Sequence, residues 1–151
     1  MTEVSQEAAN VELVERALLG VVRGADWTQL FADDGAWGSL RDAMSGAYED
    51  GCVFAWVALG QRIERIGADG LRAGWLDWLE PWTEYRSEVE SMRALDGDRV
   101  LVSVRQFGRQ ADGPEVEMHS SAIVTVRDGR ICRIDFYGRP EDALADAGLE
   151  A

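Results

Sequence analysis

The hydrophobic pattern of this chain changes its period at Trp82. Upstream of that residue, long stretches carry apolar side chains at spacings of three and four, which is typical of amphipathic helices. Downstream, apolar and polar residues alternate with a period of two, which predicts strands. Helices followed by strands is the order of an α+β domain. Because 151 residues is the length of one domain, we expect a single domain over 1–151, with 1–9 as a flexible N-terminus.

Local signals place the individual elements. We expect Asn10 to cap a helix over 7–23 that Gly24 ends, and Gly35 and Gly38 to separate the next two helices. The expected helices cover 7–23, 26–31, 40–48, 71–79 and 140–147. Asp128-Gly129 is a strong hairpin signal between the last two strands. The expected strands cover 52–58, 61–66, 83–94, 99–109, 115–127 and 130–137.

The charge balance excludes several classes of function. The chain has 28 acidic and 15 basic residues, a formal net charge of −13, and every basic residue is arginine. Such a balance argues against nucleic acid and anionic membranes as partners, because both require clustered positive charge. Without lysine there is no Schiff-base chemistry. One histidine and two distant cysteines do not make a structural zinc site, so we expect neither metal nor cofactor.

The N-terminus and the apolar runs bear on location. The first ten residues are polar and acidic and lack the pattern of a secretory signal. No apolar run approaches the roughly 20 residues of a membrane helix. We therefore expect a cytoplasmic protein in which Cys52 and Cys132 are buried free thiols.

Alternation also assigns the two faces of the sheet. One face is apolar and carries, among others, Val100, Val102, Cys132, Ile134 and Phe136, with only Gln106 and Ser120 as clearly polar residues. These two are either hydrogen-bonded structural groups or polar fixtures of a pocket. The other face is mixed, which predicts either a subunit interface or an ordinary solvated surface; it carries Leu101, Arg105, Phe107, His119, Ile123, Arg133, Asp135 and Tyr137.

Several short motifs, in order and spacing over about residues 10–149, resemble the SnoaL-like branch of the nuclear transport factor 2-like superfamily. They are Asn10-Val11-Glu12-Leu13-Val14, Gly24-Ala25-Asp26-Trp27, Gly70-Leu71-Arg72, Gly97-Asp98-Arg99-Val100, Val126-Arg127-Asp128-Gly129-Arg130-Ile131, Tyr137 and Glu141-Asp142-Ala143-Leu144. The resemblance implies a cystatin-like cone, in which a curved antiparallel sheet wraps around three to four helices and encloses a pocket. It also implies a homodimer joined through the outer sheet face.

The resemblance leaves the reaction open. Such proteins include polyketide cyclases, ketosteroid isomerases, epoxide hydrolases, dehydratases and non-enzymatic binding proteins. The aspartate base of the isomerases would fall near Trp56, and the Asp–Arg–Asp set of the epoxide hydrolases would fall on Gln106, Val104 and Phe136. The familiar catalytic residues are therefore absent from the expected places.

The remaining candidates are aromatic and ionic. A planar apolar ligand would suit a pocket lined by indoles, and the expected ligand-binding residues are Trp56, Trp75, Trp78, Trp82, Met118, Ser120 and Phe136. The alternative is that these side chains only fill the core. The expected catalytic residues are Glu88, Arg86 and Gln106, provided that the ionic face of strand 83–94 turns inward; otherwise that face is solvated. Alternation places His119 outward.

Two functions follow from these candidates. One is a dimeric pocket protein for an apolar or aromatic small molecule that acts as an isomerase, cyclase or dehydratase by general acid–base chemistry. The alternative is a non-catalytic ligand-binding or dimeric assembly module of the same fold. An open cavity that holds a carboxylate or a Gln–Ser pair would favour chemistry, whereas a cavity filled by aromatic rings would oppose it.

Overall fold

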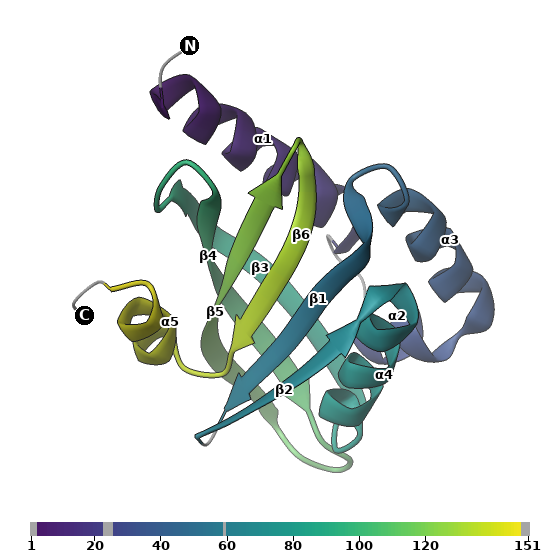
Figure 1. The fold of residues 1–151 in the computed structure, drawn as a ribbon. Helices are drawn as coiled ribbons and strands as arrows, with labels where there is room; N and C mark the ends of the chain where they lie inside the picture. Colours follow the sequence, from purple (N-terminus) through teal and green to yellow (C-terminus); the bar gives the residue numbers. More distant parts are fainter. Residues whose placement is uncertain (1–2, 23–25, 59, 149–151) are drawn as a thin grey trace.

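A computed structural model describes residues 3–22, 26–58 and 60–148 (Figure 1). Three helices precede the first strand, and a fourth helix follows the second strand. The elements are α1 (Glu3–Val22), α2 (Trp27–Ala32), α3 (Asp34–Met44), β1 (Tyr48–Ala58), β2 (Gln61–Ile66), α4 (Gly67–Leu79), β3 (Glu84–Ala94), β4 (Arg99–Arg109), β5 (Glu115–Arg127), β6 (Arg130–Tyr137) and α5 (Pro140–Asp146). The fold is α+β, as the change of period at Trp82 predicts.

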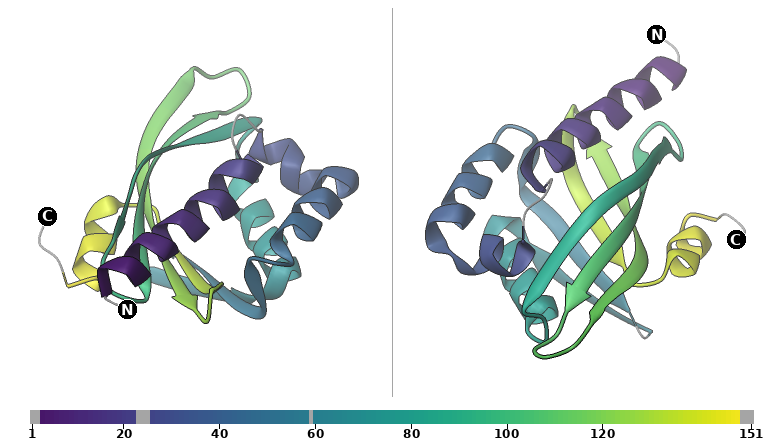
Figure 2. Two further views of the ribbon diagram at one scale, coloured as in Figure 1. Left: turned by 90° about the horizontal axis from the view of Figure 1, so that it is seen from above. Right: turned by 180° about the vertical axis from the view of Figure 1, so that it is seen from behind.

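The six strands form one curved, open sheet in the order β2-β1-β6-β5-β4-β3. Every neighbouring pair is antiparallel except β1 and β6, which run parallel with Phe54 opposite Ile134. The expectation of an all-antiparallel sheet is therefore wrong for one pair, because the last strand lies beside the first and runs parallel to it. Helices α1 to α4 lie on the concave side of the sheet, and α5 lies on the opposite side (Figure 2).

Two helix predictions are corrected. Helix α1 already begins at Glu3, so residues 3–9 are helical, and Asn10 lies inside the helix. Its side chain is buried and donates a hydrogen bond to the carbonyl oxygen of Gly97 at 2.7 Å. Helix α3 begins at Asp34, because Asp33 caps it by accepting from the Ala36 amide at 2.7 Å, and it therefore runs through Gly35 and Gly38. It ends at Met44, and Tyr48, expected in this helix, is the first residue of β1. Gly24 lies outside the described residues.

The strands after Trp82 follow the predicted boundaries closely, since β4, β5 and β6 have the expected limits. The hairpin between β5 and β6 turns at Asp128 (φ 51°) and Gly129 (φ 76°). Two positive φ angles in succession are the signature of a tight type I′ turn, which Asp-Gly favours. The hairpin prediction is confirmed.

A β-bulge changes the predicted inner face of β6. The register with β5 shifts between Thr125 and Val126, so that Val126 lies opposite Ile131. Ile131 is consequently fully buried in the main core. Cys132 is only half-buried, and its thiol donates to the carbonyl oxygen of Thr125 at 3.5 Å. Placing Cys132 on the core face with Ile134 is therefore wrong, because a bulge reverses the alternation locally.

The apolar part of the outer sheet face is covered by the chain's own C-terminal helix. Ala143 of α5 packs with Leu101, Ile123 and Tyr137 in a second apolar cluster, separate from the main core. Phe107 lies beneath the Arg86 guanidinium, 4.1 Å from the ring centroid. The outer face is thus partly occupied within one chain, and the homodimer through it stays a prediction.

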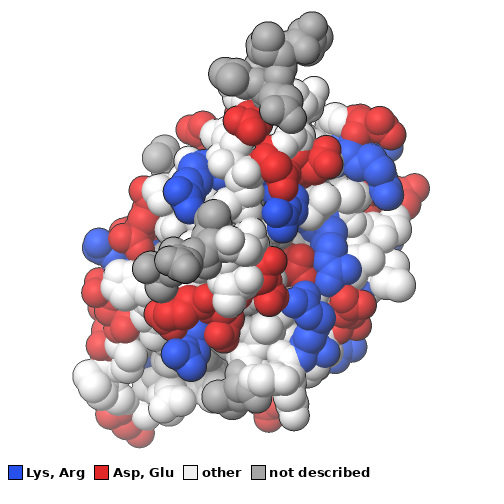
Figure 3. All heavy atoms as spheres, turned by 60° about the vertical axis from the view of Figure 1, so that its left-hand side comes forward, with Lys and Arg blue, Asp and Glu red and all other residues white. Residues whose placement is uncertain are grey.

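The surface of this side is ionic. Acidic and basic side chains both cover much of the face shown in Figure 3 and lie close to one another there. In the described part of the chain, no helix combines the length and the apolar character needed to cross a membrane.

Candidate functional site

An aromatic cluster forms the centre of the concave side. Trp75 of α4 lies in its middle, with ring centroids 4.5 Å from Trp27, 5.0 Å from Phe136 and 6.1 Å from Trp56. All three contacts are edge-to-face, the arrangement that aromatic quadrupoles favour. Gly74 makes this packing possible, because a Cβ there would overlap the Trp56 ring.

A cavity of about 80 Å³ lies beside this cluster. Six of the residues predicted from sequence line it: Trp56, Trp75, Trp78, Gln106, Ser120 and Phe136. The other lining residues are Trp27, Ser87, Val89, Val102, Val104, Ser121, Ala122, Tyr137 and Gly138. Several of them, such as Trp78 and Ser120, are only half-buried, which places the mouth of the cavity on their side.

Two predicted ligand-binding residues, Trp82 and Met118, are absent from the lining. Both are half-buried and pack against the main core. Trp82 follows α4 rather than lying on it, and its ring covers Gly108, where a Cβ would meet the indole at 2.5 Å. In this structure these two side chains pack against the core, and a role for them in ligand binding stays a prediction.

The ionic face of β3 points away from the cavity. Arg86 and Glu88 have 46% and 58% of their side chains exposed, and Arg86 contacts Glu115 at 2.9 Å and Glu88 at 3.4 Å. Tyr85 and Ser87 are buried on the inner face instead, because alternation gives each face every second residue. The inward turn on which Arg86 and Glu88 were candidates does not occur, and Gln106 is the one expected catalytic residue at the cavity.

Ser87 was missed by the sequence analysis, although its signal was present. It shares a face with Tyr85 and Val89, the less charged side of that strand. In the structure it lies directly opposite Gln106 on β4, and both residues are buried. Ser120 lies opposite Val104, one inward position further along. Ser87, Gln106 and Ser120 thus form a polar patch on an otherwise apolar wall.

No side chain that lines the cavity, among the described residues, carries a formal charge at neutral pH. Tyr137 contributes to the lining, but its hydroxyl donates to Asp146 at 2.8 Å on the other side of the sheet. Burial raises the pKa of Tyr85, next to the aromatic cluster, to about 12. Such a phenol remains protonated near pH 7, so Tyr85 offers no base there.

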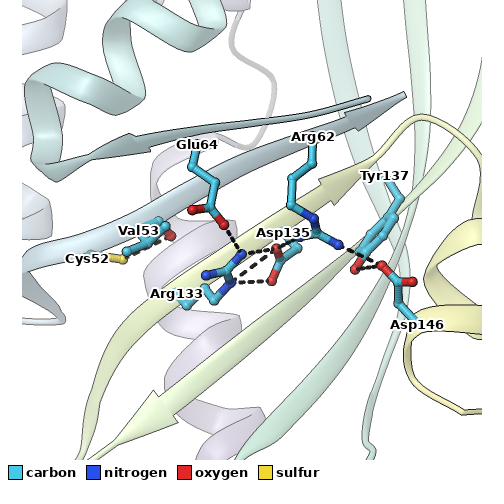
Figure 4. A network of polar contacts seen from close by, with 8 residues as sticks. All are labelled: Cys52, Val53, Arg62, Glu64, Arg133, Asp135, Tyr137 and Asp146. Carbon is cyan, nitrogen blue, oxygen red and sulfur yellow. Dashed lines mark hydrogen bonds and ion pairs between the residues drawn. The ribbon is translucent and has the colours of Figure 1, made fainter. Parts of the chain in front are cut away.

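Arginine and carboxylate side chains form a network on the outer face instead (Figure 4). Asp135 is buried at its centre, between the guanidinium groups of Arg62 and Arg133. Arg62 also reaches Asp146 of α5 at 2.8 Å, and Arg133 reaches Glu64 of β2 at 2.6 Å. The hydrogen bond to Asp135 is the main cause that raises the pKa of Arg133. The network ties β2, β6 and α5 together, which is a structural role.

His119 lies on the same outer face, as alternation predicts, and is exposed beside Glu90 at 3.1 Å. Within the described residues, no group of three or more histidine, cysteine, aspartate or glutamate side chains could hold a metal ion. The expectation of no cofactor stays a prediction.

Comparisons with solved structures agree with this architecture. A protein described as a SnoaL-like polyketide cyclase from Jannaschia sp. CCS1 is 23% identical, with a TM-score of 0.63, over 93% of this chain and 92% of that one. An epoxide hydrolase of the LEH-like kind from M. tuberculosis is 20% identical, with a TM-score of 0.53, over 87% and 84% of the two chains. At these identities the likeness concerns the fold alone.

A third similar structure is TerC co-crystallized with polyporic acid, at 14% identity and a TM-score of 0.60 over 92% of this chain and 97% of that one. A comparison with curated proteins gave no match. The family model of the SnoaL-like domain matches residues 23–134, which is well over half of the sequence. Together with the cone-shaped sheet, that match shows that this chain belongs to the SnoaL-like domain family.

Proposed function

We propose that this protein binds an uncharged, predominantly apolar small molecule in the cavity beside Trp75, and that it does so without general acid–base chemistry. The observation that carries the proposal is the composition of the lining, in which four indoles and Phe136 surround a space without a formal charge. Aromatic walls with a few polar groups are characteristic of small-molecule sites. If the ligand is aromatic, its ring would also contact the indole rings, and this adds to the free energy gained by burying apolar surface.

Charge complementarity argues for an uncharged ligand. Moving a carboxylate or an ammonium group out of water is costly unless a counter-charge or several hydrogen bonds replace the water. The walls of the cavity offer no counter-charge, since Arg86 and Glu88 lie outside it. A ligand that enters must therefore be neutral in its buried part.

The size of the cavity limits what fits. At about 80 Å³, it is smaller than the cavity of about 150 Å³ that takes up benzene in an engineered protein. A single ring can therefore be seated only if side chains at the half-buried mouth move outward, with the rest of a larger ligand at that mouth. Trp78 and Ser120 are among the half-buried lining residues that this movement would involve.

Catalysis by an isomerase, cyclase or dehydratase is the second candidate function. Gln106 supports it, because a buried amide beside a hydroxyl can stabilise a developing charge by hydrogen bonding. The geometry nevertheless favours binding, because two of the three expected catalytic residues lie on the opposite face. The proposal also includes a homodimer and a cytoplasmic location, and only the sequence supports these two.

Filling the cavity tests the proposal. Ala122 is buried and lines the cavity from β5, so Ala122→Leu would place extra carbon atoms inside it. We expect the wild type to bind toluene in an NMR titration, and to bind benzoate and benzylammonium at least about tenfold more weakly because of their charge. We expect Ala122→Leu to lose toluene binding by a similar factor.

Ala43→Leu, the same substitution at an exposed position of α3, is the matched control and should bind toluene like the wild type. Mass spectrometry of small molecules that co-purify with the native protein would identify the natural ligand. A folded Ala122→Leu variant that binds toluene with unchanged affinity would show that the cavity is not the site. Tighter binding of benzoate than of toluene would overturn the uncharged ligand.

A further inference from the structure

Strand β2 is an open edge of the sheet. It comes first in the strand order and pairs with β1, and in the described part of the chain no strand lies on its other side (Figure 1). In an antiparallel ladder, every second residue points its N–H and C=O groups away from the neighbouring strand. Such a row of free backbone groups is a template for pairing with a further strand.

The same edge exposes apolar side chains. Ile63 and Ile66 are 52% and 68% exposed, and they are two of the four large apolar residues that are exposed in the described part of the chain. Helix α4 reaches this strand through the ion pair of Asp77 with Arg65, but it leaves both isoleucines exposed. An exposed edge strand with apolar side chains is a site where association is expected.

The charges of β2 restrict which strand can pair with it. Arg62 and Glu64 point to the convex side, where they belong to the network of Figure 4. Arg65 points to the concave side, toward α4. Like charges directly opposite each other destabilise a strand pair, whereas opposite charges stabilise it. A suitable strand therefore places a carboxylate opposite Arg62 and a cation opposite Glu64.

A second copy of β2 meets this requirement in one register. When two identical antiparallel strands are related by a twofold axis, residues at equal distances from the axis lie opposite each other on the same face. With the axis at Ile63, Arg62 of each copy lies opposite Glu64 of the other. Registers centred on Arg62 or on Glu64 set that residue opposite its own like charge. Registers centred nearer to either end pair fewer residues.

The register centred on Ile63 also brings the apolar side chains into contact. Ile63 meets Ile63 of the second copy at the axis, on the concave side. Ile66 lies opposite Gly60 of the second copy, a position where an added Cβ would meet no atom within 4 Å. The Ile66 side chain thus has open space beside it. In this register β2 is complementary to itself in both charge and shape.

We propose that two copies of this chain associate through β2, antiparallel and with Ile63 at the twofold axis, so that their sheets join into one. This interface is an edge of the sheet and not the outer face that the sequence predicts for a homodimer. It involves neither the cavity nor a ligand, so it is independent of the proposed function. An edge pair buries little surface, and small interfaces are weak and transient. The association is therefore a concentration-dependent equilibrium.

Sedimentation velocity measures this equilibrium. We expect the wild type to shift from monomer toward dimer between about 10 µM and about 1 mM, the range of weak interfaces. Ile63→Lys places two like charges at the axis and should weaken the dimer at least about tenfold. Val116→Lys, at another exposed apolar residue, is the matched control and should associate like the wild type. Tryptophan fluorescence shows for both variants that they are folded.

Cysteine variants test the register. Residues directly opposite each other have Cα atoms about 4.5–5.5 Å apart, which a disulfide can bridge. Ile63→Cys should therefore form a covalent dimer under mild oxidation. Glu64→Cys lies on a diagonal of about 7–8 Å from its own copy and should link at least about tenfold more slowly. The wild type under the same oxidation shows any link through Cys52 or Cys132.

The outcomes decide between this interface and others. A wild type that stays monomeric up to about 1 mM would overturn the inference, as would a dimer that persists unchanged in Ile63→Lys. Faster linking of Glu64→Cys than of Ile63→Cys would refute the register. Growth into longer polymers would contradict a closed twofold dimer and indicate head-to-tail pairing with another surface. None of these outcomes depends on whether toluene binds, so the proposed function stands or fails separately.

Discussion

The two faces of the same sheet carry opposite kinds of side chain, apolar on one and ionic on the other. The concave face buries aromatic and aliphatic side chains around Trp75 and encloses a cavity whose walls are uncharged. The convex face carries a network of arginine and carboxylate side chains, covered in part by α5. Asp135 is the only charged side chain that is buried among the described residues, and it faces outward between two arginines.

The difference shows how an acidic chain can form an uncharged pocket. The alternation of β3 places Arg86 and Glu88 on the convex side and Tyr85 and Ser87 on the concave side. A register error of one residue would exchange the two sets. The concave packing opposes such an error, since it would bury the charges and expose Tyr85. The net charge of −13 therefore describes the surface and not the site.

The largest expected effect comes from breaking the concave face. Trp75→Ala removes the ring that contacts Trp27, Trp56 and Phe136, and we expect a loss of about 3–5 kcal/mol in the free energy of unfolding. Trp82→Ala, at a half-buried ring, should cost clearly less. Urea denaturation of both variants measures the difference, and a larger loss for Trp82→Ala would refute the central place of Trp75.

A smaller effect is expected from the convex face. Asp135→Asn removes the charge that Arg62 and Arg133 share, but each arginine keeps a second carboxylate and is about a third exposed. We expect a loss of about 1–2 kcal/mol in the free energy of unfolding and an unchanged affinity for toluene. Glu64→Gln, at the exposed end of the network, is the control. Loss of toluene binding in Asp135→Asn would show that the two faces are coupled.

The structure shows how much of this division follows from the sequence. The period of two beyond Trp82 predicts the limits of β4, β5 and β6, and alternation places Gln106 and Ser120 toward the cavity. Local patterns carry this information because each strand exposes every second residue to the same environment.

Three features depend on tertiary contacts and escaped prediction. The register shift that buries Ile131 in place of Cys132 arises from the pairing of β5 with β6. The parallel pairing of β1 with β6 joins segments about eighty residues apart. The sequence predicts helix α5 itself. Nothing in the pattern of that helix shows that it covers Leu101, Ile123 and Tyr137.

The pH dependence of the free energy of unfolding tests whether the thiol of Cys52 is buried in the main core. Burial raises the pKa of Cys52 to about 12, so the folded state favours the neutral thiol. Its stabilising contribution is complete below the thiol's ordinary pKa of 9 and is lost as pH rises toward 12. We expect the Cys52 thiol alone to lower the free energy of unfolding by about 1 kcal/mol between about pH 9 and 10. Cys52→Ala should reduce this slope, and an identical slope in the variant would contradict the assignment.

The smallest effect is expected at the ionic face of β3. Arg86 and Glu88 are about half exposed, and ion pairs of this kind contribute about 0–1 kcal/mol. A combined Arg86→Ala and Glu88→Gln variant should therefore keep its stability within about 0.5 kcal/mol and bind toluene like the wild type. A clear loss of toluene affinity would show that Arg86 or Glu88 contributes to the binding site.

The pH profile of toluene binding tests the central claim most directly, because toluene itself does not titrate. The account predicts a constant dissociation constant from about pH 5 to 9, since no described side chain that lines the cavity changes charge in that range. A sigmoidal or bell-shaped change of about tenfold within this range, in protein that remains folded, would reveal an ionisable group at the site. That result would contradict the account and restore the acid–base alternative.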